Sequence, residues 1–363
     1  MKAIYLTDFG SGALELREWP NPDIRPHDLI VEVRAAGVNR ADISYRKGAF
    51  GRANFGDSDL MGLEIAGDVL ELGTEVCGFA PGDRVMGIVG GGGYAERARI
   101  DHRMAMRIPE TLEYVHAAAV PEAFITAHES LFHLGRLERG ESVLIHAAAS
   151  GVGSAAVQLA HVAGAIVYAT AKLNQVRQLG ADITIAYKGT DFGRAVTEGS
   201  KGRGVDVILD FIGAANFERN FTSLAAGGHL IQVGLLGGFE GTQRPPDRLV
   251  HHHIQIIGTI MKSRSEEAKF AMTRRFSERW LDELKAQVIG PLIDSVFPFF
   301  AGCKSTSATG RAQECRQSYF DSVGPYGRRG RSAPRMSSRV ARRSITKALR
   351  YPQITIGGTG AND

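Results

Sequence analysis

A glycine-rich turn between an apolar strand and a helix constrains this chain more than any other feature of its sequence. The stretch 142–147 leads through two alanines into Ser150-Gly151-Val152-Gly153, and helical spacing then continues to His161. The two glycines let a backbone approach a pyrophosphate closely, and the helix N-terminus supplies unpaired N–H donors and a partial positive charge. This context predicts a nucleotide site, whereas the alternative is a tight turn without a ligand.

Strands and helices alternate on both sides of this turn. A helix is expected over 122–134, and strands are expected over 142–147, 165–170, 183–187, 205–211, 229–233 and 254–260. Such alternation requires right-handed crossovers and predicts a doubly wound parallel sheet. A helix over 265–287 and a strand over 288–297 would follow it. Residues 1–120 contain short strand patterns separated by Gly, Pro and Asp, so the fold class is α/β with a β-rich first unit.

The strand after the predicted nucleotide helix indicates which nicotinamide cofactor is preferred. Proteins that bind the ribose 2′-hydroxyl of NAD usually place Asp or Glu about 20 residues beyond the first glycines. Here the strand ends in Thr170-Ala171-Lys172. No carboxylate would repel a 2′-phosphate, and Lys172 can pair with one, so NADPH is favoured over NADH.

Charge is unevenly distributed along the chain, whose formal net charge is +4. Residues 301–363 carry 12 Lys and Arg against 3 Asp and Glu, whereas the first 300 residues are mildly acidic. The acidic body gives no indication of a nucleic-acid surface. Arginines in the tail are scattered and its aromatic residues lack the spacing of a stacking platform, so nucleic-acid binding is the less favoured alternative.

Cysteine content and hydropathy exclude several other classes of protein. Three cysteines are too few for a disulfide framework or a four-cysteine zinc site. No apolar run reaches the length of a membrane span. The N-terminal residues enter a strand pattern directly, without the apolar segment of a signal peptide, so we expect a cytoplasmic protein.

Four separated segments together resemble one enzyme family. They are 37–42 (Gly-Val-Asn-Arg-Ala-Asp), 62–67 (Gly-Leu-Glu-Ile-Ala-Gly), 120–127 (Val-Pro-Glu-Ala-Phe-Ile-Thr-Ala) and the glycine turn with its helix, 144–160. In this order they resemble the zinc-free quinone oxidoreductases of the medium-chain dehydrogenase/reductase superfamily. Within that branch the sequence is most similar to the subgroup of the human tumour-suppressor-induced quinone oxidoreductase homologue. The resemblance covers roughly residues 1–298.

The resemblance implies a GroES-like catalytic domain into which a Rossmann domain is inserted, with NADPH as hydride donor and usually a homodimer. We therefore predict a first catalytic segment at 1–123, a Rossmann NADPH-binding domain at 124–262 and a return to the catalytic domain at 263–298. Zinc-dependent relatives carry a Cys near the position of Asn39 and a His at the position of Leu63. Neither ligand is present, so no metal is expected. A quinone accepts hydride without a Lewis acid, because its reduced form is a stabilised phenolate.

Carried over position by position, the resemblance also implies a set of site residues. Asn39 is the polar group expected to face substrate, with Asp42 supporting its loop, although a simple Asx turn would also explain both residues. Glu64 is expected to be a structural ion-pair partner. The resemblance places the pyrophosphate at Ser150, Gly151, Val152 and Gly153, and the 2′-phosphate at Lys172. It places the adenosine near Tyr187 and the nicotinamide amide near Thr126. The loops over the nicotinamide are expected to contain Gly213, Gly234 and Leu235.

Two departures from the family pattern bear on activity. Only seven residues separate Thr170-Ala171 from Leu179-Gly180-Ala181, where the family has about eleven, so the helix is shortened beside Lys172. After Phe297-Pro298 the family pattern stops, and codons for 314–321 can be chosen so that a neighbouring frame encodes the family's closing strand. We therefore hypothesise that 299–363 is an out-of-frame, disordered basic tail and that the catalytic domain lacks its last strand.

These observations favour an NADPH-dependent reductase that transfers hydride to quinones or related activated enones without metal. An enoyl-thioester reductase of the same superfamily is the nearest alternative. A nucleotide-binding relative with weak activity or none is a second alternative, because both departures weaken the site. The small-molecule substrate would be the main partner besides a second copy of the chain.

Overall fold

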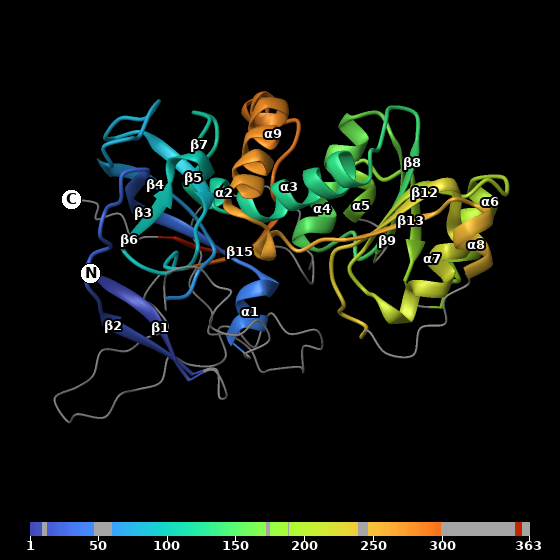
Figure 1. Cartoon of the computed structure of the whole chain (residues 1–363), viewed down its shortest axis with the longest axis horizontal. Coiled ribbons are helices and arrows are strands. Elements are labelled where there is room, and N and C mark those ends of the chain that lie inside the picture. The colour runs from blue at the N-terminus through green and yellow to red at the C-terminus, as the bar shows by residue number, and fades with distance from the viewer. Residues whose placement is uncertain are drawn as a thin grey trace, which may run out of the picture.

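The computed structural model describes residues 1–8, 13–46, 60–171, 175–187, 189–238, 246–298 and 353–357. Two large sheets lie on opposite sides of a central group of helices (Figure 1). In the view of Figure 1 the sheet built mainly from the first hundred residues is on the left, and the parallel sheet is on the right. No helix in these ranges is both long and apolar enough to cross a membrane.

The first sheet is predominantly antiparallel and has seven strands in the order β14-β15-β3-β4-β5-β7, with β6 also paired to β3. Its strands are β3 (Asp28–Val38), β4 (Glu64–Leu72), β5 (Arg84–Ile88), β6 (Arg97–Asp101), β7 (Ala105–Arg107), β14 (Ile293–Pro298) and β15 (Gln353–Gly357). A separate hairpin precedes it, formed by β1 (Lys2–Asp8) and β2 (Ala13–Glu18). The helical segments of this half are α1 (Arg40–Arg46), the 3₁₀ helix η2 (His102–Met104) and α2 (Tyr114–Ala117). As expected from the sequence, the described part of residues 1–120 is rich in strands and has only short helices.

The second sheet is parallel, with the strand order β10-β9-β8-β11-β12-β13. Its strands are β8 (Ser142–Ile145), β9 (Ile166–Ala171), β10 (Ile183–Ala186), β11 (Val205–Asp210), β12 (Leu224–Gln232) and β13 (Gln255–Gly258). Numbered from β8, this is the order 3-2-1-4-5-6 of a Rossmann sheet. The predicted fold class, α/β with a β-rich unit and a doubly wound parallel sheet, is confirmed.

Helices connect successive strands of the parallel sheet. They are α4 (Gly151–Val162), α5 (Gln175–Gln178), α6 (Phe192–Gly199), the 3₁₀ helix η4 (Ala214–Asn216), α7 (Phe217–Ser223) and α8 (Pro246–His251). Every residue of β8 is buried, as a strand covered on both faces must be. Because β8 and β11 are neighbours while their crossovers leave in opposite directions, the order of strands reverses between them. Ligands bind at such a position in open parallel sheets.

The C-terminal region differs from the prediction made for it. We expected the catalytic sheet to lack its last strand, but β15 lies between β14 and β3, parallel to the first and antiparallel to the second. Its sequence, Gln-Ile-Thr-Ile-Gly, is rich in β-branched residues, and it pairs with backbone groups that would otherwise lie at open strand edges. The expected absence of this strand is therefore wrong. The rest of the proposed out-of-frame tail, 299–352 and 358–363, lies outside the described residues.

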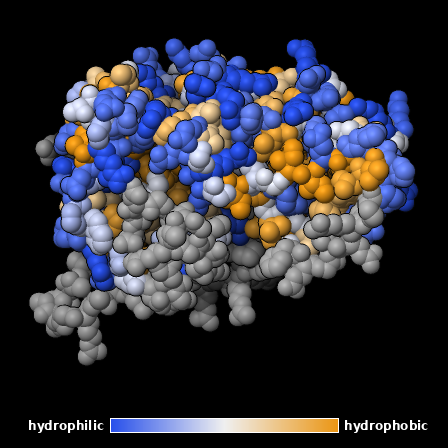
Figure 2. All heavy atoms as spheres, in the orientation of Figure 1, coloured by the Kyte–Doolittle hydropathy of each residue, from blue (hydrophilic) through white to orange (hydrophobic). Residues whose placement is uncertain are grey.

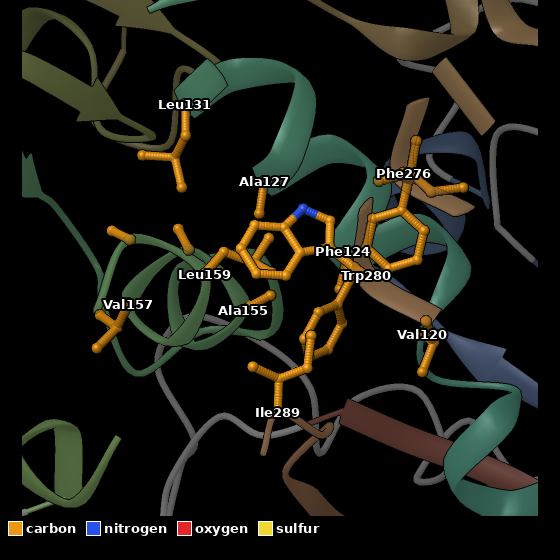
Figure 3. Packing of buried hydrophobic residues seen from close by; sticks show 14 of the residues in the cluster. Val120, Phe124, Ala127, Leu131, Ala155, Val157, Leu159, Phe276, Trp280 and Ile289 are labelled. Carbon is orange, nitrogen blue, oxygen red and sulfur yellow. The ribbon is translucent and has the colours of Figure 1, made fainter. Parts of the chain in front are cut away.

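Helix α3 (Pro121–His128) continues as a π-helix, η3 (Glu129–Leu134), and lies between the two sheets (Figure 1). The predicted helix 122–134 thus exists, with a change of helical type near its middle. The 3₁₀ helix η5 (Met261–Ser263) and the long α9 (Glu266–Lys285) follow the parallel sheet. Figure 3 shows Phe124 of α3 beside Phe276 and Trp280 of α9, with Leu159 of α4 nearby. One hydrophobic core therefore joins both halves through α3.

A buried histidine connects α9 to this core. The indole N–H of Trp280 donates a hydrogen bond to Nδ1 of His128 at 2.9 Å, and His128 is 3% exposed. Burial, together with Arg279 and Arg275, lowers the pKa of His128 to about 3. The imidazole ring therefore stays neutral in the folded protein at neutral and mildly acidic pH.

His128 should make the free energy of unfolding depend on pH. The unfolded chain binds a proton on this ring near its ordinary pKa of 6.5, whereas the folded chain does so only near 3. Its contribution is complete above pH 6.5 and is lost as the pH falls toward 3, by roughly 1 kcal/mol between pH 6 and 5. In His128→Gln, whose amide oxygen can still accept from Trp280, that loss should disappear. Urea unfolding of both proteins at pH 7.5, 6 and 5 measures it, and a pH-independent difference between them contradicts it.

Candidate functional site

The predicted nucleotide turn occupies the carboxyl end of β8. Ala147 has a left-handed backbone conformation (φ 47°), which turns the chain sharply toward α4. Ser150 is the N-cap of α4, and its Oγ accepts a hydrogen bond from the N–H of Gly153 at 3.1 Å. A Cβ at Gly153 would lie 2.4 Å from the carbonyl oxygen of Ala147. Only glycine allows strand and helix to approach this closely, so the turn has the geometry of an anion site at a helix N-terminus.

Other predicted cofactor residues lie at the same edge of the parallel sheet. Gly213 follows β11 with a φ of 86°, and a Cβ there would lie 2.9 Å from a methyl group of Leu235, which follows β12. Gly234 packs against Phe211 at the end of β11, and Tyr187 is an exposed residue just after β10. Because all of these strands are parallel, their carboxyl ends bring these loops together. Lys172, predicted at the 2′-phosphate, lies outside the described residues.

A buried polar network stands behind this edge, and the sequence analysis did not identify it. His146, 1% exposed, contacts Oγ1 of Thr170 at 3.1 Å through Nδ1 and Oδ1 of Asn220 at 2.8 Å through Nε2. Asn220 donates to Asp210, whose carboxylate also accepts the backbone N–H groups of residues 212 and 213. Burial lowers the pKa of His146. The network therefore holds the loop that contains Gly213, and its one sequence signal is a histidine at the end of an apolar strand.

Asn39 and Asp42 belong to a second cluster, between β3 and α1. Oδ2 of Asp42, in the first turn of α1, accepts the backbone N–H of Asn39 at 2.8 Å, which is the reach-back bond of a capping box and not the forward bond of an Asx turn. The amide nitrogen of Asn39 donates to Oε1 of Glu64 at 2.7 Å. Asp42 is completely buried, and its Oδ1 has no hydrogen-bond partner in the part of the chain that the structure describes. Burial raises the pKa of Asp42 to about 7.

Glu64 was expected to form an ion pair, and this expectation is wrong for the described residues. Its carboxyl group is fully buried and accepts two N–H groups, one from the Asn39 side chain and one from the backbone of Glu122 at 2.8 Å. Burial raises the pKa of Glu64 to about 8. A Cβ at Gly37 would lie only 2.0 Å from Oε1 of Glu64, so glycine at this position makes room for the carboxyl group.

Two further charged residues face this cluster and were not predicted as functional. Glu122 begins α3 and is half-buried, and burial raises the pKa of its carboxyl to about 7. Lys262 of η5 interacts electrostatically with Asp42 and Glu122, and burial lowers the pKa of its ammonium group to about 8. The ammonium also lies 5.1 Å from the ring centroid of Tyr45. Three carboxyl groups and one amine, from α1, β4, α3 and η5, therefore lie close together at the start of α3. The pKa of each group is displaced toward neutrality.

The described residues contain no group of three or more His, Cys, Asp and Glu arranged to hold a metal ion. At the two positions where zinc-dependent relatives were expected to place ligands, Asn39 is bound to Glu64 and Leu63 is a buried apolar side chain. Neither side chain has the sulfur or imidazole donors that zinc prefers.

Two family models match the two halves of the chain. Residues 25–110 match the alcohol dehydrogenase GroES-like domain, and residues 151–277 match the domain described as zinc-binding dehydrogenase. Together the two models match more than half of the chain, which therefore belongs to the medium-chain dehydrogenase/reductase superfamily.

The individual proteins to which the chain is similar are of more than one kind. Erythronolide synthase EryA2 of Saccharopolyspora erythraea is 40% identical over 253 residues, which is 66% of this chain but 7% of that protein. A quinone oxidoreductase structure from Pseudomonas syringae pv. tomato is 25% identical, with a TM-score of 0.71 over 81% of this chain and 91% of its own. The CurK enoyl reductase structure has a TM-score of 0.76 over 99% of both chains, at 21% identity. At this identity, the similarity to the CurK enoyl reductase is a similarity of fold alone.

Substituting Gly37 should reveal how tightly the Glu64 cluster is packed. In Gly37→Ala the new methyl group would overlap Oε1 of Glu64 and crowd the carbonyl of Ala118, 2.7 Å away. Overpacking of this kind lowers the free energy of unfolding by about 1–3 kcal/mol. The matched control is Gly290→Ala, because a Cβ at Gly290 meets no atom within 4 Å. Urea unfolding compares the two, and equal stabilities would mean that the cluster can relax around the methyl group.

Proposed function

We propose that the protein is an NADPH-dependent, zinc-independent reductase that transfers hydride to quinones or related activated enones. The observation that carries this proposal is the Ser150–Gly153 turn at the reversal point of the parallel sheet, with α3 joining it to the cluster around Asn39. Its proposed parts are a catalytic domain of residues 1–123 and 263–298 and a cofactor domain of residues 124–262. Membership of the quinone oxidoreductase branch, and of the tumour-suppressor-induced subgroup, is part of the proposal.

The residues present fit a dinucleotide. Ser150, Gly151, Val152 and Gly153 would hold the pyrophosphate, with Gly213, Gly234 and Leu235 over the nicotinamide and Thr126 at its amide. Strand β9 ends in Thr170 and Ala171, and the sequence contains no Asp or Glu over 166–174, where NAD-dependent proteins usually carry the carboxylate that binds a 2′-hydroxyl. We propose that Lys172 pairs with the 2′-phosphate and that Tyr187 contacts the adenosine. When bound, NADPH supplies the hydride.

The residues do not fit a catalytic zinc ion. Asn39 offers an amide that already donates to Glu64, and Leu63 is apolar. We therefore assign polarisation of the substrate carbonyl to hydrogen bonding, with Asn39 as the proposed contact and Asp42 as the residue that fixes its backbone.

An enoyl-thioester reductase is the second candidate. It is supported by the similarity of more than half of this chain to polyketide synthases and by the fold shared with the CurK enoyl reductase. A third candidate is a nucleotide-binding protein with little or no activity. Weak binding of both cofactors in the titration described next would favour it.

Cofactor choice is tested by fluorescence titration with NADPH and NADH side by side. We expect clearly tighter binding of NADPH. In Gly153→Ala the new methyl group overlaps the carbonyl oxygen of Ala147 and displaces the first turn of α4. NADPH binding should therefore weaken by roughly 5- to 150-fold, which corresponds to about 1–3 kcal/mol of binding free energy. The control is Gly193→Ala in the first turn of α6, where a Cβ lies 3.3 Å or more from its neighbours. Equally weak binding of both cofactors would contradict the proposal.

The homodimer implied by the family resemblance has a candidate surface. Strand β13 is the last strand on one side of the parallel sheet among the described residues. Ile256 on this strand and Ile260 just beyond it are 42% and 52% exposed. Figure 2 shows hydrophobic residues gathered over the half of the molecule that contains the parallel sheet. We propose that two copies associate through this edge.

Light scattering after size exclusion tests the dimer. Ile256→Lys should shift the protein from dimer to monomer, because a lysine at a strand edge opposes pairing with another chain. Ile166→Lys is the control, since Ile166 is 46% exposed but lies on β9, inside the sheet. A mass that is the same for both variants would exclude this edge as the interface.

A further inference from the structure

One face of α3 remains partly open although the rest of the helix is buried. Six of its eight residues are buried, and the two exceptions are Glu122 and Thr126. Residues four apart lie on the same face of a helix. Since Thr126 is the residue proposed at the nicotinamide amide, the carboxyl group of Glu122 lies one helical turn away, on the same face.

The surroundings of Glu122 hold its backbone but leave its carboxyl group available. Its N–H donates to Glu64 of β4, and in the described ranges no group forms a hydrogen bond with its carboxyl oxygens. The charged groups that face it are Asp42 of α1, Glu64 of β4, Lys262 of η5 and Lys269 of α9. The carboxyl group of Asp42 is fully buried in the same cluster. The site thus contains an available acid at the junction of the two sheets.

We propose that Glu122 is the proton donor that completes the reduction of a carbon–carbon double bond conjugated to a carbonyl group. Activated enones and enoyl compounds, rather than quinones, are then the substrate class. This inference rests on the proposed function, because it requires a reduced nicotinamide beside Thr126.

The reaction balances in two steps. Hydride adds to the β-carbon, so that a C–H bond forms, the carbon–carbon π bond breaks, and the electron pair moves onto the carbonyl oxygen as an enolate. The α-carbon then takes the proton of the Glu122 carboxyl group, and the carbonyl bond is restored. The substrate is reduced by two electrons, the nicotinamide is oxidised by two, and Glu122 is left as a carboxylate facing Lys262. Water reprotonates it through the open face of α3.

The two substrate classes differ in their need for such a donor. A reduced quinone is protonated on oxygen, which solvent does quickly, whereas an enolate must be protonated on carbon at one face. A positioned acid contributes about 10²–10⁴-fold to such a proton transfer. Burial holds the pKa of Glu122 at about 7, so a large fraction of the carboxyl groups carries a proton at neutral pH.

The test compares one cyclic enone and one para-quinone in the purified full-length chain with NADPH. Glu122→Gln keeps the size of the side chain but removes the acid, and the ratio of enone to quinone turnover should fall about 100-fold. Glu122→Asp should recover part of that ratio. The control is Lys285→Met, an exposed change at the end of α9, which should leave the ratio as it is. NADPH titration of each variant verifies that the cofactor site has folded.

Two readouts on the wild-type chain keep the inference testable if the variants fail to fold. Enone turnover should fall as the pH rises above about 7, because Glu122 then loses its proton. In D₂O, deuterium should enter the α-carbon at a single face. A pH-independent enone rate, deuterium at both faces, or an unchanged ratio in Glu122→Gln would overturn the inference. Reduction of the quinone but not the enone overturns it while the proposed function stands, and reduction of neither overturns both.

Discussion

The carboxyl group of Glu64 is buried where β4 meets the start of α3, and it accepts one N–H from Asn39 and another from the backbone of Glu122. A buried carboxyl group without such donors would cost several kcal/mol. The two bonds therefore fix the Asn39 loop and the first turn of α3 relative to one another. Gly37 is required for this arrangement, because any side chain would occupy the position of the Glu64 carboxyl group.

Helix α3 passes this constraint on to the rest of the molecule. One side of the helix packs on α4 and α9 in the core that Figure 3 shows, where Phe124, Leu159 and Trp280 meet. Its remaining face presents Glu122 and Thr126. The carboxyl ends of the parallel strands lie beyond it, where His146 and Asp210 hold the loop of Gly213 through Asn220. Each half of the molecule thus contains one buried polar network, and each network fixes a loop that the proposed reaction uses.

Buried polar groups of this kind also explain why the acid cluster is poised near neutrality. Burial raises the pKa values of Asp42, Glu64 and Glu122, and the charge of Glu122 raises those of Asp42 and Glu64 further. Burial lowers the pKa of Lys262. Groups with pKa values displaced toward neutrality in this way are common at catalytic sites, because proton transfer is most effective when donor and medium are matched. The cluster is consistent with chemistry that includes a proton as well as a hydride.

The sequence by itself determined the class of the fold and the nucleotide turn. Hydrophobic period, strand–helix alternation and the glycines at 151 and 153 are local signals, and local signals survive in a single sequence. They predicted the strands of the parallel sheet and the helix at Ser150, which the structure contains. Asn39 and Asp42 were proposed from the family resemblance and not from these local signals, and the ion pair expected for Glu64 does not occur among the described residues.

Only the tertiary structure decided what surrounds those residues. Glu122 and Lys262 are 140 positions apart in the sequence, and neither has a local pattern that distinguishes it from a solvated surface charge. Strand β15 likewise forms by pairing with β3 and β14, which lie far from it in the sequence. The pattern of residues 353–357 alone does not predict this pairing. Burial, electrostatic interaction and sheet pairing arise between segments that are distant in the sequence. The sequence therefore predicts the helices and strands, and only the tertiary packing determines which of their side chains are in contact.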